Sequence, residues 1–286
     1  MKISKSLALK AMKKIANQKN KEERAIIKKI ALLIFIILMS SCDFTPPINR
    51  KIIDAQNYIT KQEYKKAAYL YEDILKSNPA PDLRLKMCYQ LGELYSIYLG
   101  EYKKAVYYYN EVKELTEDPL WLIKTEEKLA EINFNYRKDY KEAIKNYTRL
   151  SLFTPKLKKY DFFQFQIALA YYYVKDTENA IKQLLKIESD TNHEYFVRSF
   201  YYLGLIYYEQ KDYNKALFVW SEYLKRETKK EYVVQAKFLV ANIYESTENL
   251  KMAYDIYYSI ADEYPNPEVI ENRLTSLYQR RVARRR

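Results

Sequence analysis

Small residues recur in pairs along most of this chain, among large apolar and aromatic residues. The two members of a pair lie twelve or thirteen positions apart, and the second members recur every 36 to 38 residues. Six pairs follow one another: Ala55 and Ala67, Gly92 and Ala105, Ala130 and Ala143, Ala168 and Ala180, Gly204 and Ala216, Ala241 and Ala253. The chain therefore contains a sixfold internal repeat, numbered here one to six.

Aromatic residues keep fixed distances from these small residues. Three positions after the first small residue stand Tyr58, Tyr95, Asn133, Tyr171, Tyr207 and Tyr244. Four positions after the second stand Tyr71, Tyr109, Tyr147, Leu184, Trp220 and Tyr257. Offsets of three and four place residues on one face of an α-helix. Each repeat is therefore predicted to be a hairpin of two amphipathic helices.

Polar residues and prolines mark the predicted helix ends. The second helix of each repeat is expected to begin after Glu63, Glu101, Asp139, Asp176, Asp212 or Asn249, most of which can cap a helix. Pro79, Pro119, Pro155 and Pro265 close four of the six repeats, and no proline falls inside a predicted helix. A closing amphipathic helix with Ile270, Leu274 and Leu277 on its apolar face is expected from Pro267 to Arg286.

These features resemble the tetratricopeptide repeat, whose first helix carries Leu-Gly-x-x-Tyr and whose second helix carries Ala followed by an aromatic residue. The segment 202–220, YLGLIYYEQKDYNKALFVW, matches that pattern best. The resemblance implies an all-α fold, a tetratricopeptide-repeat solenoid of about six helical hairpins over residues 51–266, with a capping helix and Arg-rich tail over 267–286. The period of 36 to 38 residues exceeds the usual 34, and the fourth repeat is the weakest match.

The N-terminus has a different pattern. Residues 1–29 are rich in lysine, residues 30–39 read IALLIFIILM, and Ser40, Ser41 and Cys42 follow at once. The apolar run is too short for a stable membrane-spanning helix. This layout resembles a bacterial lipoprotein signal, which implies cleavage of residues 1–41 and lipidation of Cys42; the start methionine, Met1 or Met12, stays open. The alternative is a buried apolar helix with an accidental cysteine.

Residues 42–50 are expected to form a lipidated tether, because Pro46 and Pro47 favour extended backbone. Two or three acyl chains would hold the soluble part firmly at a membrane.

The positive charge of the chain is concentrated at its two ends, which limits the kinds of partner it can bind. Of the net charge of +12, residues 1–42 supply +8, from ten Lys and Arg against two Asp and Glu. Five more positive charges come from the C-terminal arginines, Arg280, Arg281, Arg284, Arg285 and Arg286. This tail suits phospholipid headgroups or an acidic partner, or is simply solvated. The array between the two ends is nearly neutral, so a cytosolic nucleic-acid binder that uses the Arg-rich tail is the weaker alternative.

Few residues are available for catalysis or cofactors. Three glycines cannot form a Walker-type loop or a dinucleotide turn, and one histidine excludes the zinc sites that need several. We therefore expect no enzyme, metal, cofactor or small-molecule substrate. His193 is expected in a surface loop, and Cys88 as a buried free thiol.

In the tetratricopeptide family, positions minus six, minus three, plus one and plus four from the first small residue line a concave groove. In repeats four and five these positions hold Phe162, Phe165, Leu169, Tyr172, Arg198, Tyr201, Leu205 and Tyr208. We predict an aromatic groove, with Arg198 at one end, for an apolar segment of a partner protein. The alternative is that these rings pack against a neighbouring helix.

The layout of signal and repeats resembles BamD-type outer-membrane assembly lipoproteins. It implies a periplasmic scaffold, anchored by Cys42, that binds a β-barrel assembly subunit, with the outer membrane as the first expectation. Asp43 is an inner-membrane retention signal in enteric bacteria, which counts against that location. A lipoprotein of a cell-division, secretion or motility complex is the alternative function.

Overall fold

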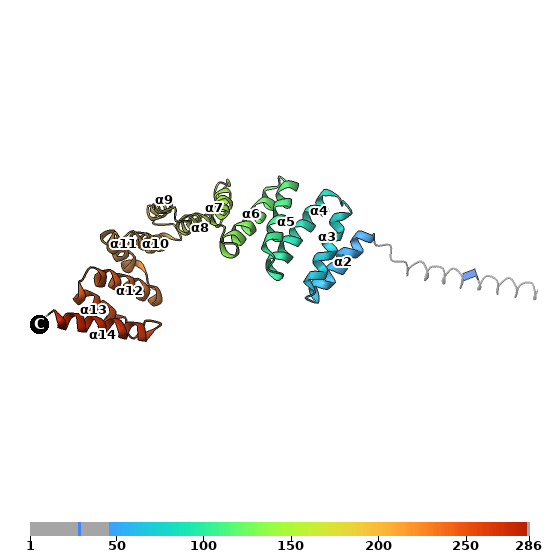
Figure 1. The fold of residues 1–286 in the computed structure, drawn as a ribbon. Helices are drawn as coiled ribbons and strands as arrows, with labels where there is room; N and C mark the ends of the chain where they lie inside the picture. Colours follow the sequence, from blue (N-terminus) through green and yellow to red (C-terminus); the bar gives the residue numbers. More distant parts are fainter. Residues whose placement is uncertain (1–27, 30–45, 285–286) are drawn as a thin grey trace, which may run out of the picture. The chain divides into compact units, whose positions relative to one another are not determined.

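The computed structural model describes residues 28–29 and 46–284, and Figure 1 shows the ribbon. Cys42 and all of the expected signal peptide except Lys28 and Lys29 lie outside the described residues, as do Arg285 and Arg286. The chain divides into two compact parts, residues 1–74 and 75–286.

The first part holds repeat one. It contains α2 (Pro47–Thr60) and all but the last two residues of α3 (Tyr64–Lys76). Ala55 and Ala67 are fully buried, and the Lys51 ammonium lies 2.6 Å from the Asp73 carboxylate across the hairpin. Residues 47–50 are thus helical, which corrects the expected extended tether. The physical reason is that proline at the first helical position loses no hydrogen bond and has the helical φ angle already.

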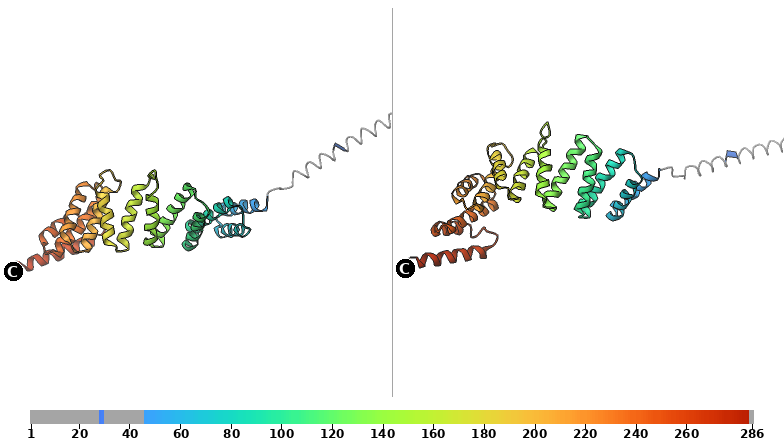
Figure 2. Two further views of the ribbon diagram at one scale, coloured as in Figure 1. Left: turned by 90° about the horizontal axis from the view of Figure 1, so that it is seen from above. Right: turned by 45° about the horizontal axis from the view of Figure 1, so that its top comes forward.

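The second part holds repeats two to six and the closing helix. Its helices are α4 (Pro81–Glu93), α5 (Tyr102–Leu115), α6 (Pro119–Glu131), α7 (Tyr140–Ser151), α8 (Tyr160–Tyr173), α9 (Thr177–Glu188), α10 (Phe196–Glu209), α11 (Tyr213–Arg226), α12 (Lys230–Ser246), α13 (Leu250–Ser259) and α14 (Pro267–Ala283). Each helix packs against the next along the chain (Figure 2). The described part of the chain is all-helical, and its hairpins form a tetratricopeptide-repeat solenoid.

The predicted starts of the second helices are confirmed. The side chains of Asp139, Asp176 and Asp212 each accept a hydrogen bond of 3.3 Å from the backbone N–H three residues later, and Asn249 does so at 3.4 Å. These bonds satisfy backbone donors that the first helical turn leaves free. Glu101 precedes α5 without such a bond.

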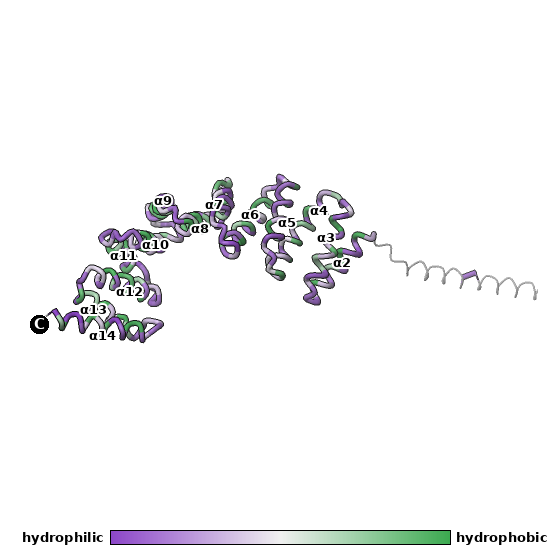
Figure 3. Tube along the Cα trace, viewed as in Figure 1, coloured by the Kyte–Doolittle hydropathy of each residue, from purple (hydrophilic) through white to green (hydrophobic). Residues whose placement is uncertain are grey.

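The small residues lie where two helices approach closely. A Cβ atom added to Gly204 would lie 2.2 Å from Nε1 of Trp220, and one added to Gly92 would lie 2.6 Å from the ring of Tyr109. Trp220 and Tyr109 are both fully buried. The repeated pairing of a small residue with a ring is therefore the packing unit of the core. Hydrophobic and hydrophilic residues are interspersed along the helices (Figure 3).

The first helices of repeats two and three end differently from the others. Each is extended by one π-helical turn, η1 (Leu94–Tyr98) after α4 and η2 (Ile132–Tyr136) after α6. In these two repeats the small residues are thirteen positions apart, whereas in the other four they are twelve apart. A π turn accommodates one extra residue in a helix, so the spacing and the π turns have the same cause.

Two further expectations concern single residues. Cys88 is a buried free thiol, as predicted, and burial raises its pKa to about 11. His193 lies in a loop but is buried, which corrects the expected surface position. Its Nδ1 accepts a hydrogen bond from the backbone N–H of Tyr195, and the rings of Tyr195 and Phe165 stack nearby, so the loop folds inward.

The closing helix α14 is amphipathic, as predicted. Ile270 and Leu277 are fully buried. Within the described part of the chain, no helix combines the length and the apolar character needed to cross a membrane.

Candidate functional site: the inner face of the first helices

The structure brings the predicted groove residues of repeats four and five together only in part. Phe165 and Leu169 on α8 are only 3% and 7% exposed. The Phe165 ring stacks on Tyr195 at a centroid distance of 4.5 Å. These two residues cannot contact a partner, so the alternative of packing within the chain holds for them. For Phe165 the cause is the inward-folded loop that carries His193 and Tyr195.

Arg198 and Tyr201 line an open pocket of about 200 Å³ between α10, α11 and α12. Its other lining residues are Tyr202, Tyr223, Tyr232 and Gln235. The guanidinium carbon of Arg198 lies 5.9 Å from the centre of the Phe165 ring and 6.0 Å from that of Tyr232. Cation–π contacts of this kind hold an arginine in place without neutralising it.

Arg198 forms no ion pair within the described residues. Two tyrosines that line the same pocket, Tyr201 and Tyr202, have pKa values raised by burial, so their hydroxyl groups stay protonated at neutral pH. The pocket therefore combines one positive charge with aromatic walls. That combination suits a partner segment with an acidic group beside an apolar side chain.

The other predicted groove residues serve different contacts. Phe162 faces Tyr147 at 6.0 Å, and the Tyr172 hydroxyl donates to the Glu209 carboxylate. Tyr208 packs beside Trp220 at 5.9 Å. Leu205 is half-buried.

The C-terminal arginines bind their own chain. Arg273 and Arg280 lie 3.3 and 3.2 Å from the Glu245 carboxylate, and Arg280 also lies 2.7 Å from Glu248. Arg284 pairs with Glu248 as well. These contacts connect α14 to α12 and line a polar pocket of about 360 Å³ that includes Tyr208. Arg280 and Arg284 are thus paired within their own chain, by Glu245 of α12 and by Glu248 just after this helix, which corrects the expected free tail for these two arginines. Arg281 forms no ion pair among the described residues and lies over the Tyr254 ring at 5.5 Å.

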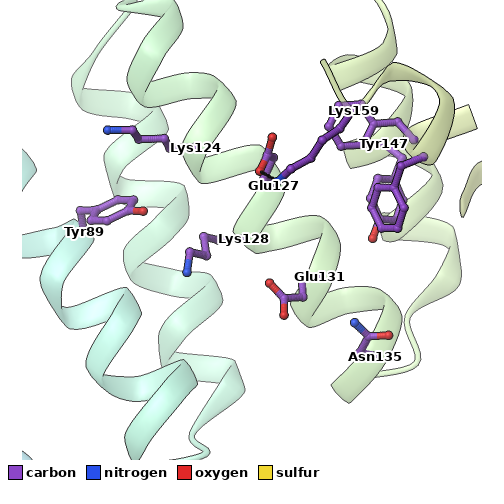
Figure 4. A pocket seen from close by; sticks show the side chains of 10 residues that line it. Tyr89, Lys124, Glu127, Lys128, Glu131, Asn135, Tyr147 and Lys159 are labelled. Carbon is purple, nitrogen blue, oxygen red and sulfur yellow. Dashed lines mark hydrogen bonds and ion pairs between the residues drawn. The ribbon is translucent and has the colours of Figure 1, made fainter. Parts of the chain in front are cut away.

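A third pocket lies in repeats two to four and was not predicted from the sequence (Figure 4). It has a volume of about 370 Å³. Its walls come from the inner sides of α4, α6, η2, α7 and α8, with Tyr89, Lys124, Glu127, Lys128, Glu131, Asn135, Tyr147, Lys159, Phe162 and Phe163. Tyr89, Lys124, Glu127 and Glu131 occupy the same repeat offsets as the predicted groove. Applying that rule to repeats two and three would have found them.

Charges in this pocket are partly paired. Lys159 reaches the Glu127 carboxylate at 2.7 Å, and Figure 4 shows the two side chains meeting. Lys128 lies 3.6 Å from Glu93. Lys124 and Glu131 have no ion-pair partner among the residues that the structure describes. Two charges of opposite sign are therefore available at the rim.

A buried polar network lies behind this pocket in repeat three. Glu126, only 3% exposed, pairs with Lys113 at 2.5 Å and Arg149 at 3.1 Å and accepts a hydrogen bond of 2.6 Å from Asn146. Asn133, which stands where other repeats have tyrosine, donates to Asn146 at 3.0 Å. Satisfied buried networks specify one arrangement of their helices, so the wall formed by α6 and α7 is well fixed.

The chemistry of these pockets is that of binding. Among the described residues, no group of three or more His, Cys, Asp and Glu side chains could hold a metal ion. The groups that face the pockets are aromatic rings, tyrosine hydroxyls and charged side chains, which recognise a ligand through packing, hydrogen bonds and charge.

Comparisons with known proteins agree with the repeat fold. The sequence profile of the tetratricopeptide repeat matches residues 198–227, which form α10 and α11. No curated protein matches the sequence at a significant level.

Similar solved structures include the Naa15/Naa10 complex bound to HypK, with 16% identity over 82% of this chain and 39% of the other and a TM-score of 0.53. The type IV pilus biogenesis factor PilW has 17% identity over 81% of this chain and 98% of its own, with a TM-score of 0.49. A tetratricopeptide repeat protein of Thermus thermophilus has 21% identity over 68% and 99%, with a TM-score of 0.39. At these identities the likeness concerns the fold. The chain has the architecture of a tetratricopeptide-type interaction scaffold.

Proposed function

We propose that this chain is a membrane-anchored scaffold that binds a segment of a partner protein along the inner face of its first helices. The observation that carries the proposal is the pocket around Arg198. It presents an arginine without an acidic partner among the described residues, held between two rings and next to exposed parts of Tyr201 and Tyr232. An aromatic surface with one unneutralised charge is typical of a site that another protein covers.

The membrane anchor is proposed from the sequence. A Lys-rich start, a ten-residue apolar run and Ser40-Ser41-Cys42 support export and acylation of Cys42. The scaffold would then face the periplasm, with residues 43–46 as the link to α2. The first proposed partner is a β-barrel assembly subunit in the outer membrane, on the BamD-like layout alone. A cell-division, secretion or motility complex is the second.

A site-specific crosslinking experiment tests the scaffold function. A photo-reactive amino acid is placed at Tyr201, inside the pocket, and as a matched control at Phe218 on α11, which is 66% exposed and lines none of these pockets. We expect a defined crosslinked protein from position 201 that is missing from position 218 and is lost when Arg198 is replaced by Glu. Equal crosslinking at both positions would contradict a specific groove. Mass spectrometry of the crosslinked protein identifies the complex.

A further inference from the structure

The pocket in repeats two to four is lined by a tyrosine whose hydroxyl group makes no hydrogen bond with the described residues. Tyr147 is only 3% exposed, yet its side chain lines the pocket (Figure 4). Its hydroxyl makes no hydrogen bond with the described part of the chain. Burial raises its pKa, so it remains a donor at neutral pH. The hydroxyl therefore offers a free donor to the pocket, and a ligand that presents a carbonyl oxygen can accept a hydrogen bond from it.

The rim of the same pocket carries two unmatched charges. Lys124 and Glu131 are seven residues apart on α6, about 10 Å along the helix axis at 1.5 Å per residue. Lys124 lies over the Trp121 ring at 5.6 Å, and neither residue has a partner of opposite charge among the described residues. Between them, Glu127 and Lys128 are neutralised by Lys159 and Glu93. The pocket thus presents a positive end and a negative end.

The π turn η2 shapes the pocket by shifting the helix register. In repeats four to six, position plus four holds Tyr172, Tyr208 and Glu245, and the last two line a pocket. In repeat three the corresponding residue, Phe134, is only 8% exposed and packs on the rings of Tyr140, Tyr147 and Tyr173. Asn135, one residue later, lines the pocket instead. The extra residue therefore replaces a large ring at the rim by a small polar side chain, which keeps the pocket open.

We propose that this pocket is a second binding site, for an extended segment of a partner protein that carries one acidic and one basic side chain three residues apart. An extended segment in the polyproline II conformation has three residues per turn and rises about 3.1 Å per residue. Side chains three residues apart therefore lie on one face of it and span the distance between Lys124 and Glu131. A backbone carbonyl of the segment accepts from the Tyr147 hydroxyl, and an apolar side chain between the charges packs on Phe162 and Tyr89. The inference rests on the proposed scaffold function, which it extends from one site to two.

Peptide binding to the full mature chain in detergent tests the proposal. The probes are two fluorescein-labelled peptides, Ala-Asp-Leu-Phe-Lys-Ala and its charge-exchanged form Ala-Lys-Leu-Phe-Asp-Ala, both amidated. The neutral control is Ala-Asn-Leu-Phe-Gln-Ala. We expect fluorescence anisotropy to show one charge order bound at least fivefold more tightly than the neutral peptide. The double variant Lys124→Glu with Glu131→Lys should prefer the opposite order.

The tyrosine hydroxyl provides a separate readout. Tyr147→Phe should weaken binding about fivefold, the size of one hydrogen bond, without loss of fold. Tyr109→Phe is the matched control, because Tyr109 holds the same position in repeat two but does not line the pocket. Its binding should equal that of the native chain.

Equal binding of charged and neutral peptides, or an unchanged affinity in Tyr147→Phe, would overturn the second site. Specific crosslinking at Tyr201 in that case would leave the proposed scaffold function standing. Charge-dependent binding here with equal crosslinking at Tyr201 and Phe218 would support this pocket and contradict the Arg198 site.

Discussion

Gly204 lies at the closest approach of α10 and α11, and a methyl group there would meet the indole of Trp220. The indole cannot swing away, because it is fully buried and its Nε1 donates to the backbone carbonyl of Tyr201 at 3.1 Å. Gly204→Ala should therefore destabilise the fold by about 1–3 kcal/mol, the usual cost of overpacking. Chemical denaturation measures it. Ser221→Ala, on the exposed side of α11, should change little, and equal stability of both variants would contradict tight packing.

The turn inside each repeat contains one residue with a left-handed backbone. Five of these are not glycine: Gln62, Lys138, Lys175, Lys211 and Glu248, whereas repeat two has Gly100. A side chain at φ near +60° costs roughly 1–2 kcal/mol, which glycine avoids at the expense of a more flexible unfolded chain.

Lys211 is the clearest position for a test, since its φ is 63° and its side chain has no ion pair among the described residues. We expect Lys211→Gly to raise the free energy of unfolding by up to about 1 kcal/mol. Lys211→Ala keeps the strained backbone and should give no such gain. A similar gain in both variants would show that the lysine side chain, rather than the backbone, is unfavourable.

His193 makes stability depend on pH. Burial lowers its pKa below the ordinary value of 6.5, against the opposing effect of Asp161 and Glu194. The unfolded chain then binds a proton at higher pH than the folded one, so stability falls as the pH drops below about 6.5. Thermal denaturation at pH 7.5 and pH 5.5 measures the loss. His193→Gln should show a smaller loss over this range, and an equal loss would assign the effect to other groups.

At the scale of helices, capping and spacing could be predicted from the sequence, because both depend on residues close in the chain. Asp139, Asp176 and Asp212 precede their helices as expected. The thirteen-residue spacing in repeats two and three was visible as well, but a longer loop would have explained it equally. The π turns η1 and η2 show that the extra residue lies inside the helix in both repeats.

The candidate site was less predictable, because it depends on contacts between repeats. The repeat positions that line the groove in the tetratricopeptide family correctly predicted that Arg198 and Tyr201 share one surface. It could not foresee that Tyr195 would cover Phe165, since that depends on how a loop folds. The sequence showed a cluster of arginines at the C-terminus. It did not show that they pair with Glu245 and Glu248, because these acids lie about thirty residues earlier in the chain.

The ion pairs between α14 and α12 are predicted to stabilise the closing helix. Glu245 is a shared partner of Arg273 and Arg280, so Glu245→Lys replaces two attractions by repulsions. Hydrogen exchange of α14 should become several-fold faster, because a small charge network of this kind contributes on the order of 1 kcal/mol. Exchange in α4 and α5 should not change. The packing of Ile270 and Leu277 keeps the helix formed.

Glu222→Lys is the matched control, since Glu222 pairs only with Lys225 and Arg226 on its own helix. Equal exchange rates in α14 for the two variants would show that apolar packing alone holds the closing helix.

For the whole molecule, the distribution of charge bears on the choice of partner. Most of the net charge of +12 lies in the Lys-rich start and the terminal arginines. Arg273 and Arg280 are neutralised by Glu245 of α12, and Arg284 by Glu248 just after this helix. The pockets of the repeats carry charges of both signs on aromatic walls. A protein segment fits such surfaces better than a polyanion, which needs an extended positive surface.

The two cysteines allow the proposed lipid anchor to be tested without disturbing the fold. Cys88 is 1% exposed within α4, and burial raises its pKa to about 11, so its thiol is neither accessible nor reactive. If Cys42 carries the lipid, cells grown with radioactive palmitate should label the native protein and the Cys88→Ser variant alike, and should not label Cys42→Ser. Intact mass of the labelled protein should lack residues 1–41. Label retained in Cys42→Ser, or an unprocessed N-terminus in the native protein, would contradict the proposed lipid anchor. The proposed scaffold function would still stand, without an assigned location.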